Sequence, residues 1–157
     1  MTLYAAEASL YVSPERGFYE VGDVFEIKVL ADTGDESMNA AEAEITFDPN
    51  ELSVEDVSTD GSVLSLWPTP PTFSNETGTI RFSGWTNKKY SGDSGLLATI
   101  FFRPLRVTLS SARLAAGAIL AADGKSSNII KNMRSGVYTI GPRTILAEAP
   151  KDRKSVV

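Results

Sequence analysis

Hydrophobic and polar residues alternate with a period of two along most of the chain. Phe25, Ile27 and Val29, for example, alternate with Glu26 and Lys28. Successive side chains of a β-strand point to opposite faces of its sheet, so this pattern predicts a strand with one buried and one exposed face. Similar segments, separated by clusters of Gly, Pro, Asn and Asp, recur along the chain and predict an all-β protein.

About nine such segments are present, which is typical of an antiparallel β-sandwich. The predicted strands are residues 3–12, 24–31, 39–47, 52–57, 72–74, 79–85, 96–103, 112–122 and 136–140. A chain of 157 residues is long enough for one domain with its own core. Because the alternation stops near Gly141, we expect a domain over residues 1–140 and a linker or tail over residues 141–157.

Two segments need more than the alternation to be interpreted. Residues 112–122 are rich in alanine, which favours a helix, but Gly117 lies in the middle and the other segments already predict a sheet that this one would complete. Leu52, Val54 and Val57 are not strictly two residues apart, which indicates a β-bulge. We therefore predict strands at both places, and a loop over residues 88–95.

Composition narrows the chemistry available to the protein. The chain contains no cysteine and no histidine, which removes thiol nucleophiles, thiolate metal sites and the commonest general base, so we do not expect an enzyme. A formal charge of −5 disfavours binding to the phosphate backbone of nucleic acids. No apolar run approaches the roughly 18 residues of a membrane span, so we expect no direct membrane insertion.

Charge is unevenly distributed along the chain. Residues 1–60 contain 15 acidic and two basic residues, whereas residues 61–140 contain three acidic and nine basic residues. Two interpretations remain open: the folded surface has two poles that steer a partner, or early and late strands pair so that the charges offset one another.

Several segments, taken in order, resemble the cohesin domain family. They are the turn Val21-Gly22-Asp23, the run FDPNELSV at residues 47–54, GTIRF at 78–82 and LAADG at 120–124, and the resemblance covers about residues 8–140. It implies a nine-stranded jelly-roll sandwich that acts as a non-catalytic module of a cell-surface or scaffold protein, outside the cell. The implied partner is a dockerin, a small module that carries the calcium, so no cofactor is expected on this chain.

The resemblance also implies which surface binds the partner. In cohesins one flat sheet face does so, and its strands match residues 39–47, 72–74, 79–85 and 112–122. The outward positions of the first and third of these segments are the candidate partner-binding residues: Glu42, Glu44, Thr46, Arg81, Ser83 and Trp85.

Other functions are compatible with the same residues. Trp67, Phe73, Trp85 and Tyr90 lie within 24 residues and could form an aromatic platform for a polysaccharide, as in a carbohydrate-binding module, unless Trp67 and Phe73 instead hold the proline-rich loop on the core. Glu42 and Glu44 are two carboxylates on one strand, an arrangement more typical of a partner contact or a solvated face than of a glycosidase. A structural spacer domain is a third possibility.

Two groups of oxygen-bearing side chains could offer ligands to calcium. They are Asp32, Asp35 and Glu36 around Gly34, and Asp123 with Asn128. Neither matches a calcium-binding loop, and Asp and Asn more often bond their own backbone in turns. The sequence therefore predicts no metal site, with these positions as the weak exceptions.

Overall fold

The structure, a computed structural model, describes residues 6–144, which form eleven β-strands and no helix. No element of this part of the chain is therefore a helix long and apolar enough to cross a membrane. The strands are β1 (Ala8–Ser13), β2 (Arg16–Glu20), β3 (Phe25–Asp32), β4 (Met38–Thr46), β5 (Leu52–Ser58), β6 (Thr72–Ser74), β7 (Thr79–Tyr90), β8 (Gly95–Pro104), β9 (Thr108–Ala121), β10 (Ile130–Arg134) and β11 (Gly136–Gly141).

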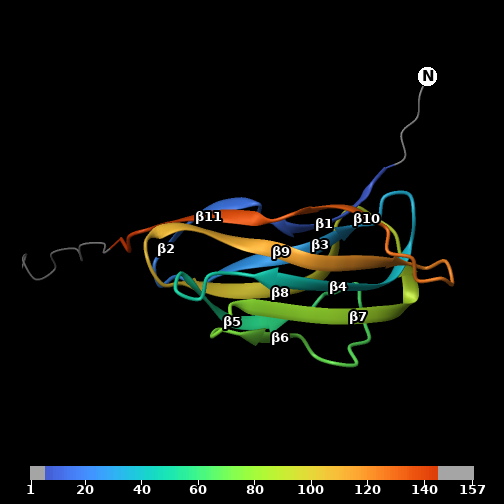
Figure 1. Cartoon of the computed structure of the whole chain (residues 1–157), viewed down its shortest axis with the longest axis horizontal. Coiled ribbons are helices and arrows are strands. Elements are labelled where there is room, and N and C mark those ends of the chain that lie inside the picture. The colour runs from blue at the N-terminus through green and yellow to red at the C-terminus, as the bar shows by residue number, and fades with distance from the viewer. Residues whose placement is uncertain (1–5, 145–157) are drawn as a thin grey trace, which may run out of the picture.

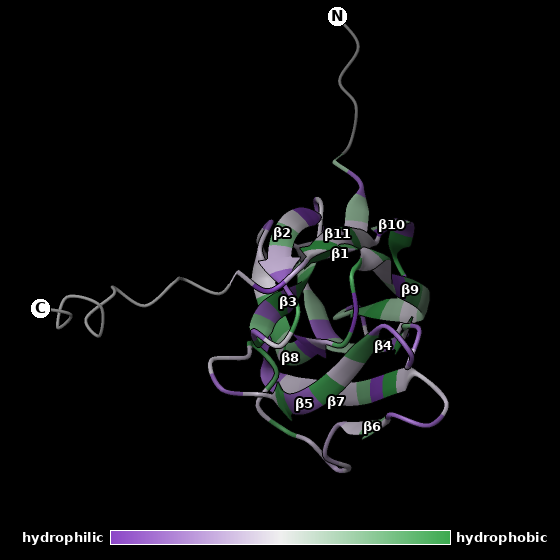
Figure 2. Ribbon diagram, turned by 90° about the vertical axis from the view of Figure 1, so that its left-hand side faces the viewer, coloured by the Kyte–Doolittle hydropathy of each residue, from purple (hydrophilic) through white to green (hydrophobic). Residues whose placement is uncertain are grey.

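The strands form two sheets that pack face to face (Figures 1 and 2). The five-stranded sheet has the order β10-β1-β3-β8-β5, and the six-stranded sheet has the order β2-β11-β9-β4-β7-β6. Neighbouring strands are antiparallel except at two edges, where β10 pairs with β1 and β2 pairs with β11 in parallel. The predicted β-sandwich is confirmed, and its strand pairing is antiparallel apart from these two edges.

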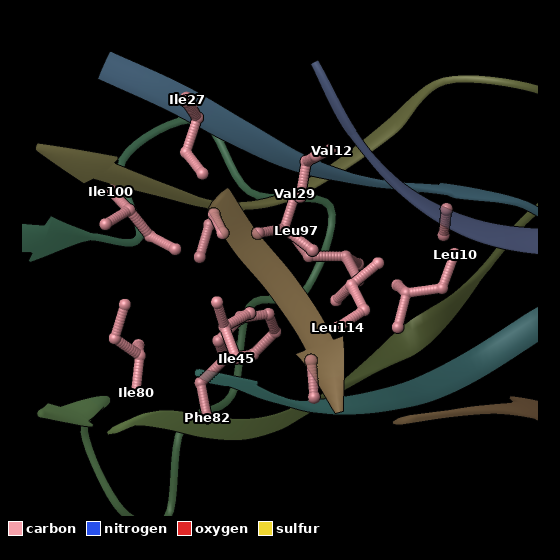
Figure 3. Packing of buried hydrophobic residues seen from close by; sticks show 14 of the residues in the cluster. Leu10, Val12, Ile27, Val29, Ile45, Ile80, Phe82, Leu97, Ile100 and Leu114 are labelled. Atoms are coloured by element: carbon pink, nitrogen blue, oxygen red, sulfur yellow. The ribbon is translucent and has the colours of Figure 1, made fainter. Parts of the chain in front are cut away.

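The core fills the space between the sheets. The inward residues of the alternating strands, among them Leu10, Ile27, Ile45, Ile80 and Ile100, are fully buried and point toward one another (Figure 3). Burial of each such side chain stabilises the fold by about 1.5–3 kcal/mol relative to exposure, which makes this layer the main source of stability. The period of two in the sequence is thus the signature of one core-facing side on each strand.

Nine of the eleven strands lie where the alternation predicts them, and β2 and β10 were not predicted. Both are five residues long and lie at sheet edges, and β10 has no buried residue at all. Such strands are held by backbone pairing rather than by an apolar face, so they leave little hydrophobic pattern in the sequence. Residues 3–5 of the first predicted strand lie outside the described residues.

The loop predicted over residues 88–95 is shorter in the structure. β7 continues to Tyr90, so residues 88–90 are strand rather than loop, because Tyr90 pairs with Met38 of β4. The irregular spacing in β5 is a true register shift between Val54 and Asp56 against β8, as predicted.

The alanine-rich segment is a strand, as predicted. β9 pairs with β4 on one side and β11 on the other, with a register shift that leaves Ala115 as an extra residue. A Cβ atom on Gly117 would lie 2.4 Å from the end of the Leu10 side chain, so β9 packs closely on β1 of the other sheet at this glycine. Small side chains here allow close packing of the sheets rather than favouring a helix.

The uneven charge of the chain is offset in part by folding. The four ion pairs among residues 6–144 each join an acidic residue of the first 60 to a basic residue of the later part: Glu15 to Arg134, Glu44 to Arg81, Glu51 to Arg106 and Glu55 to Arg103. Pairing between early and late strands, rather than two charged poles, is the interpretation that these contacts support.

The domain extends slightly beyond the predicted boundary. Gly141 belongs to β11, and the backbone N–H and hydroxyl of Thr144 both donate to the carboxylate of Glu20 at 2.9 Å. These bonds lower the pKa of Glu20 below its usual range. The rest of the predicted tail, residues 145–157, lies outside the described residues.

Candidate functional site

The four segments expected to form the binding face are neighbours in one sheet. β9, β4, β7 and β6 lie side by side in this order in the six-stranded sheet (Figure 1). The side of these four strands that faces away from the core is called the outer face below. Its central row is formed by Ala40, Glu42, Glu44 and Thr46 of β4, which alternate with the buried residues of that strand.

The strand register brings the predicted residues of β4 and β7 together. Glu42 lies opposite Ser83, Glu44 opposite Arg81, and Ala40 opposite Trp85. Directly opposite residues of an antiparallel pair have Cβ atoms about 4.5–5.5 Å apart, so these side chains contact one another. All six predicted positions therefore belong to one continuous surface.

One ion pair organises the centre of the outer face. The Nε–H of Arg81 donates to Oε2 of Glu44 at 2.6 Å, and the NH2 nitrogen of the same guanidinium lies 2.6 Å from that oxygen. The Arg81 side chain remains 67% exposed and that of Glu44 29% exposed. Arg81 therefore retains free donors that could contact another molecule while its stem is held in place.

Glu42 differs from Glu44 in having no basic partner among residues 6–144. Its neighbours across the two strand pairs are Ser83 and Ala118, whose side chains are too short to cover an exposed carboxylate. An exposed acid surrounded by small residues is available to a partner at little cost, because no existing contact has to be broken.

A shallow groove of about 350 Å³ runs beside these residues. Its floor includes Ala116 and Gly117 of β9, and its far rim is formed by Thr69 and Pro70 of the loop before β6 together with Thr72. None of these five residues is among the six predicted positions, although Thr72, Ala116 and Gly117 lie in segments that the resemblance assigns to the binding face. Thr69 and Pro70 belong to the proline-rich loop, and nothing in the local sequence pattern indicates that this loop lies beside the sheet.

Trp85 marks one end of the outer face. Its backbone exchanges two hydrogen bonds with Leu66, of 2.8 and 2.9 Å, so the start of the proline-rich segment is fastened to β7 at this residue. Its side chain is nonetheless 47% exposed. A large aromatic side chain held on a rigid strand and half exposed is the type of residue that often dominates a protein interface.

The four aromatic residues considered as a sugar platform are not assembled into one. Trp67 packs edge-on against Phe82, donates its indole N–H to the carbonyl oxygen of Leu64 and lies against Gly84, where a Cβ atom would come within 2.9 Å of the ring. It therefore holds the proline-rich loop on the core. Tyr90 is also packed against the core, which leaves Phe73 and Trp85 exposed.

Three of the acidic residues that could offer oxygens to calcium accept hydrogen bonds in the loops between strands. Asp32 accepts the N–H of Gly34, Asp35 accepts that of Ala6, and Asp123 accepts the N–H of Lys125 and the hydroxyl of Ser127. Hydrogen bonds to the ionised form, first of all that from Lys125, lower the pKa of Asp123. These carboxylates stabilise loops between strands, the role that Asp commonly has in turns.

The fold is shared with solved structures from bacteria and an archaeon. A non-cellulosomal cohesin from Archaeoglobus fulgidus is 18% identical, with a TM-score of 0.68, and the match covers 95% of this chain and 98% of that chain. The seventh ScaB type I cohesin of Pseudobacteroides cellulosolvens is 15% identical with a TM-score of 0.70, over 91% and 97% of the two chains. A cohesin in a type I cohesin–dockerin complex from Clostridium thermocellum is 12% identical with a TM-score of 0.68, over 91% and 99%.

The sequence itself matches a family model. No curated protein sequence is similar enough to this chain to count as a match. The model described as the cohesin domain, however, matches residues 14–140, which spans β2 to β11 and all four strands of the outer face. The chain therefore belongs to the cohesin domain family.

Proposed function

We propose that this domain binds a dockerin-like protein module through the outer face of β9, β4, β7 and β6. The observation that carries the proposal is the assembly of Glu42, Arg81 and Trp85 on one rigid, solvent-facing sheet, with small residues beside them. Solved structures with the same fold include cohesins in complex with dockerins. The calcium in such a complex would belong to the partner.

The proposed role is non-catalytic. A glycosidase places two carboxylates on opposite sides of the bond that is cleaved. Here Glu42 and Glu44 lie on the same side of one strand, and the carboxylate of Glu44 is bonded to the guanidinium of Arg81. The residues are suited to a charged contact with a protein surface. A domain of this kind would tether its partner to a cell-surface or scaffold protein, which places it outside the cell.

The proposal is tested by capture and then by titration. The immobilised domain is exposed to extract from the source organism with calcium, and bound protein is eluted with a chelator and identified by mass spectrometry. A protein with paired calcium loops is then titrated calorimetrically against the wild-type domain and the Glu42→Lys and Trp85→Ala variants. We expect Trp85→Ala to cost about 2 kcal/mol or more of binding free energy, the size typical of an aromatic residue that dominates an interface.

Glu26→Lys provides the matched control. Glu26 is an exposed acid on the outer side of β3, in the opposite sheet, so the same charge reversal changes the net charge equally but not the outer face. We expect its affinity to equal that of the wild type. If Glu42→Lys and Trp85→Ala also bind with wild-type affinity, this face does not bind the partner. Elution of polysaccharide in place of a calcium-loop protein would favour a carbohydrate-binding module.

A further inference from the structure

β2 lies at the edge of the six-stranded sheet opposite β6, and one side of its backbone pairs with no strand among residues 6–144 (Figure 2). Val137 donates its N–H to the carbonyl oxygen of Glu15, and Val21 donates to that of Gly141. In a parallel ladder alternate residues of a strand bond to the same neighbour. The residues facing β11 are therefore those of odd number, and the backbone groups of Arg16, Phe18 and Glu20 point to the open side.

The side chains of the same three residues share the solvent-facing side of the sheet. Phe18 is 82% exposed, and the register places it beside Thr139 of β11 and, one strand further, Leu109 of β9, which is 65% exposed. An open strand edge beside exposed apolar side chains is a surface that proteins normally cover, because it can pair with another strand.

The sequence of β2 is complementary to itself about Phe18. When two copies of the strand are paired antiparallel with Phe18 opposite Phe18, Arg16 of each copy lies opposite Glu20 of the other. We propose that the open edge of β2 pairs with β2 of a second copy of this chain, related by a two-fold axis through Phe18. Opposite charges directly across from one another stabilise an antiparallel pair, and here symmetry creates two such pairs.

Within the described residues, no hydrogen bond uses the backbone groups needed for this pairing. The N–H and carbonyl of Phe18 exchange two hydrogen bonds across the axis, and the N–H of each Glu20 reaches the carbonyl of Arg16 in the other copy. The carbonyl of Glu20 already accepts the N–H of Asp23 at 3.1 Å, so it is not counted. Four backbone hydrogen bonds therefore join the two copies, with the two Phe18 rings in contact beside them.

The charged groups are also placed for the pairing. Arg16 forms no ion pair within the part of the chain that the structure describes. The two hydrogen bonds from Thr144 hold the carboxylate of Glu20 in position and favour its ionised form. A junction of two short strands is small compared with the roughly 1,200–2,000 Å² of a stable interface, so the dimer dissociates on dilution.

The arrangement has a consequence for partner binding. Antiparallel pairing continues the sheet, so the two-fold axis is perpendicular to it and the outer faces of both copies point the same way. A dimer therefore presents two copies of the proposed binding face on one side, which increases the apparent affinity for a partner that carries two modules.

The test is sedimentation velocity of the full chain over a wide range of concentrations, with the fold of each variant checked by circular dichroism. We expect a reversible dimer for the wild type. Phe18→Asp abolishes it, and Arg16→Glu weakens it by about tenfold or more, because symmetry replaces two attractive pairs with two repulsive ones. The double variant Arg16→Glu/Glu20→Arg restores the dimer. Phe73→Asp, at the opposite edge of the sheet, serves as the control and stays dimeric.

Three results would overturn the proposal. They are a wild-type chain that remains monomeric at every concentration, a Phe18→Asp variant that dimerises as well as the wild type, and a charge-swapped double variant no better than Arg16→Glu. A monomeric wild type whose affinity for a captured partner falls in Phe18→Asp would assign the edge to that partner instead. Binding of a single dockerin module to the outer face is independent of all three results.

Discussion

A single amide side chain connects the two sheets at the turn after β6. Asn75 accepts the N–H of Val54 at 2.8 Å and donates to its carbonyl oxygen at 3.0 Å, replacing a strand partner for this residue of β5. Val54 is buried. Removal of the Asn75 amide would therefore leave the N–H and the carbonyl oxygen of Val54 without these hydrogen-bond partners in a place that water does not reach easily.

We therefore expect Asn75→Ala to lower the free energy of unfolding by about 1–3 kcal/mol, the cost of leaving buried polar groups unpaired. Urea denaturation measures this change. Asn87→Ala is the matched control, because Asn87 is exposed on β7 and has no side-chain hydrogen bond among residues 6–144. Equal stability of the two variants would show that the amide of Asn75 is not a structural link.

Tyr138 combines burial with a specific hydrogen bond. Its ring is fully buried and its hydroxyl donates to the carbonyl oxygen of Pro14 at 2.8 Å, across the connection between β1 and β2. Burial raises the pKa of Tyr138 above its usual value, because the charged phenolate would lose its hydration.

This shift predicts a loss of stability at high pH. The unfolded chain releases the proton of this tyrosine near pH 10 while the folded chain keeps it, so the free energy of unfolding falls as the pH rises above about 10. Tyr138→Phe should cost about 0.5–1.5 kcal/mol at pH 7 and show a smaller decline between pH 9 and pH 11. Chemical denaturation of both proteins over this range is the measurement. Parallel pH profiles would contradict the prediction.

At the scale of an element, the turn before β7 depends on a glycine for two reasons. Gly78 has a φ of 72°, and a Cβ atom there would lie 2.1 Å from the carbonyl oxygen of Phe47 at the end of β4. Its own carbonyl accepts the N–H of Phe47 at 2.9 Å. The turn is thus packed directly on the backbone of the strand that carries Glu42 and Glu44.

Comparison with Gly124 separates the backbone strain of a positive φ from the steric clash of an added Cβ atom. It has a similar φ of 79°, but nothing lies within 4 Å of its Cβ position. Gly124→Ala should therefore cost only the backbone strain of about 1 kcal/mol, whereas Gly78→Ala should cost clearly more because the backbone of Phe47 must move. The difference between the midpoints of thermal unfolding of the two variants measures the destabilisation caused by the steric clash at Gly78. Equal midpoints would mean that the turn adapts without disturbing β4.

At the scale of the whole molecule, a residue near the end of the domain is hydrogen-bonded to a residue near its start. Thr144 donates two hydrogen bonds to Glu20, so residues 142–144 close over the turn that follows β2. We expect a chain that ends after Gly141 to unfold at a lower temperature than one that ends after Thr144. Differential scanning calorimetry of the two truncated chains is the test, and Glu20→Gln in the longer one checks that the contact is responsible. Identical midpoints would place the end of the folded unit at β11.

The alternation of apolar and polar residues is enough to predict which side of its strand each residue of the candidate site occupies. Glu42, Glu44, Arg81 and Trp85 were correctly placed on the outer sides of their strands, because a period of two leaves them no other side once the apolar residues are inside. Their alignment opposite one another depends on register, which links residues about 40 positions apart and has no local signal. The role of these residues in binding stays a prediction.

Other features of the structure could not be predicted from the sequence, for physical reasons. Whether Trp67 and Tyr90 pack on the core depends on how the proline-rich loop and the end of β7 fold against it. The side of the groove that Thr69 and Pro70 form depends on where the same loop lies beside the sheet. β2 and β10 pair in parallel with strands far away in sequence, and such edge strands need no apolar face.

By itself, the sequence determined the all-β class, most strands and their buried sides, because alternation and turn residues act locally. Only the tertiary structure decided the order of strands, the pairing of early acids with late bases and the open edge of β2. These depend on long-range backbone pairing, in which any strand offers the same N–H and carbonyl groups, and the packing of the whole core selects one arrangement.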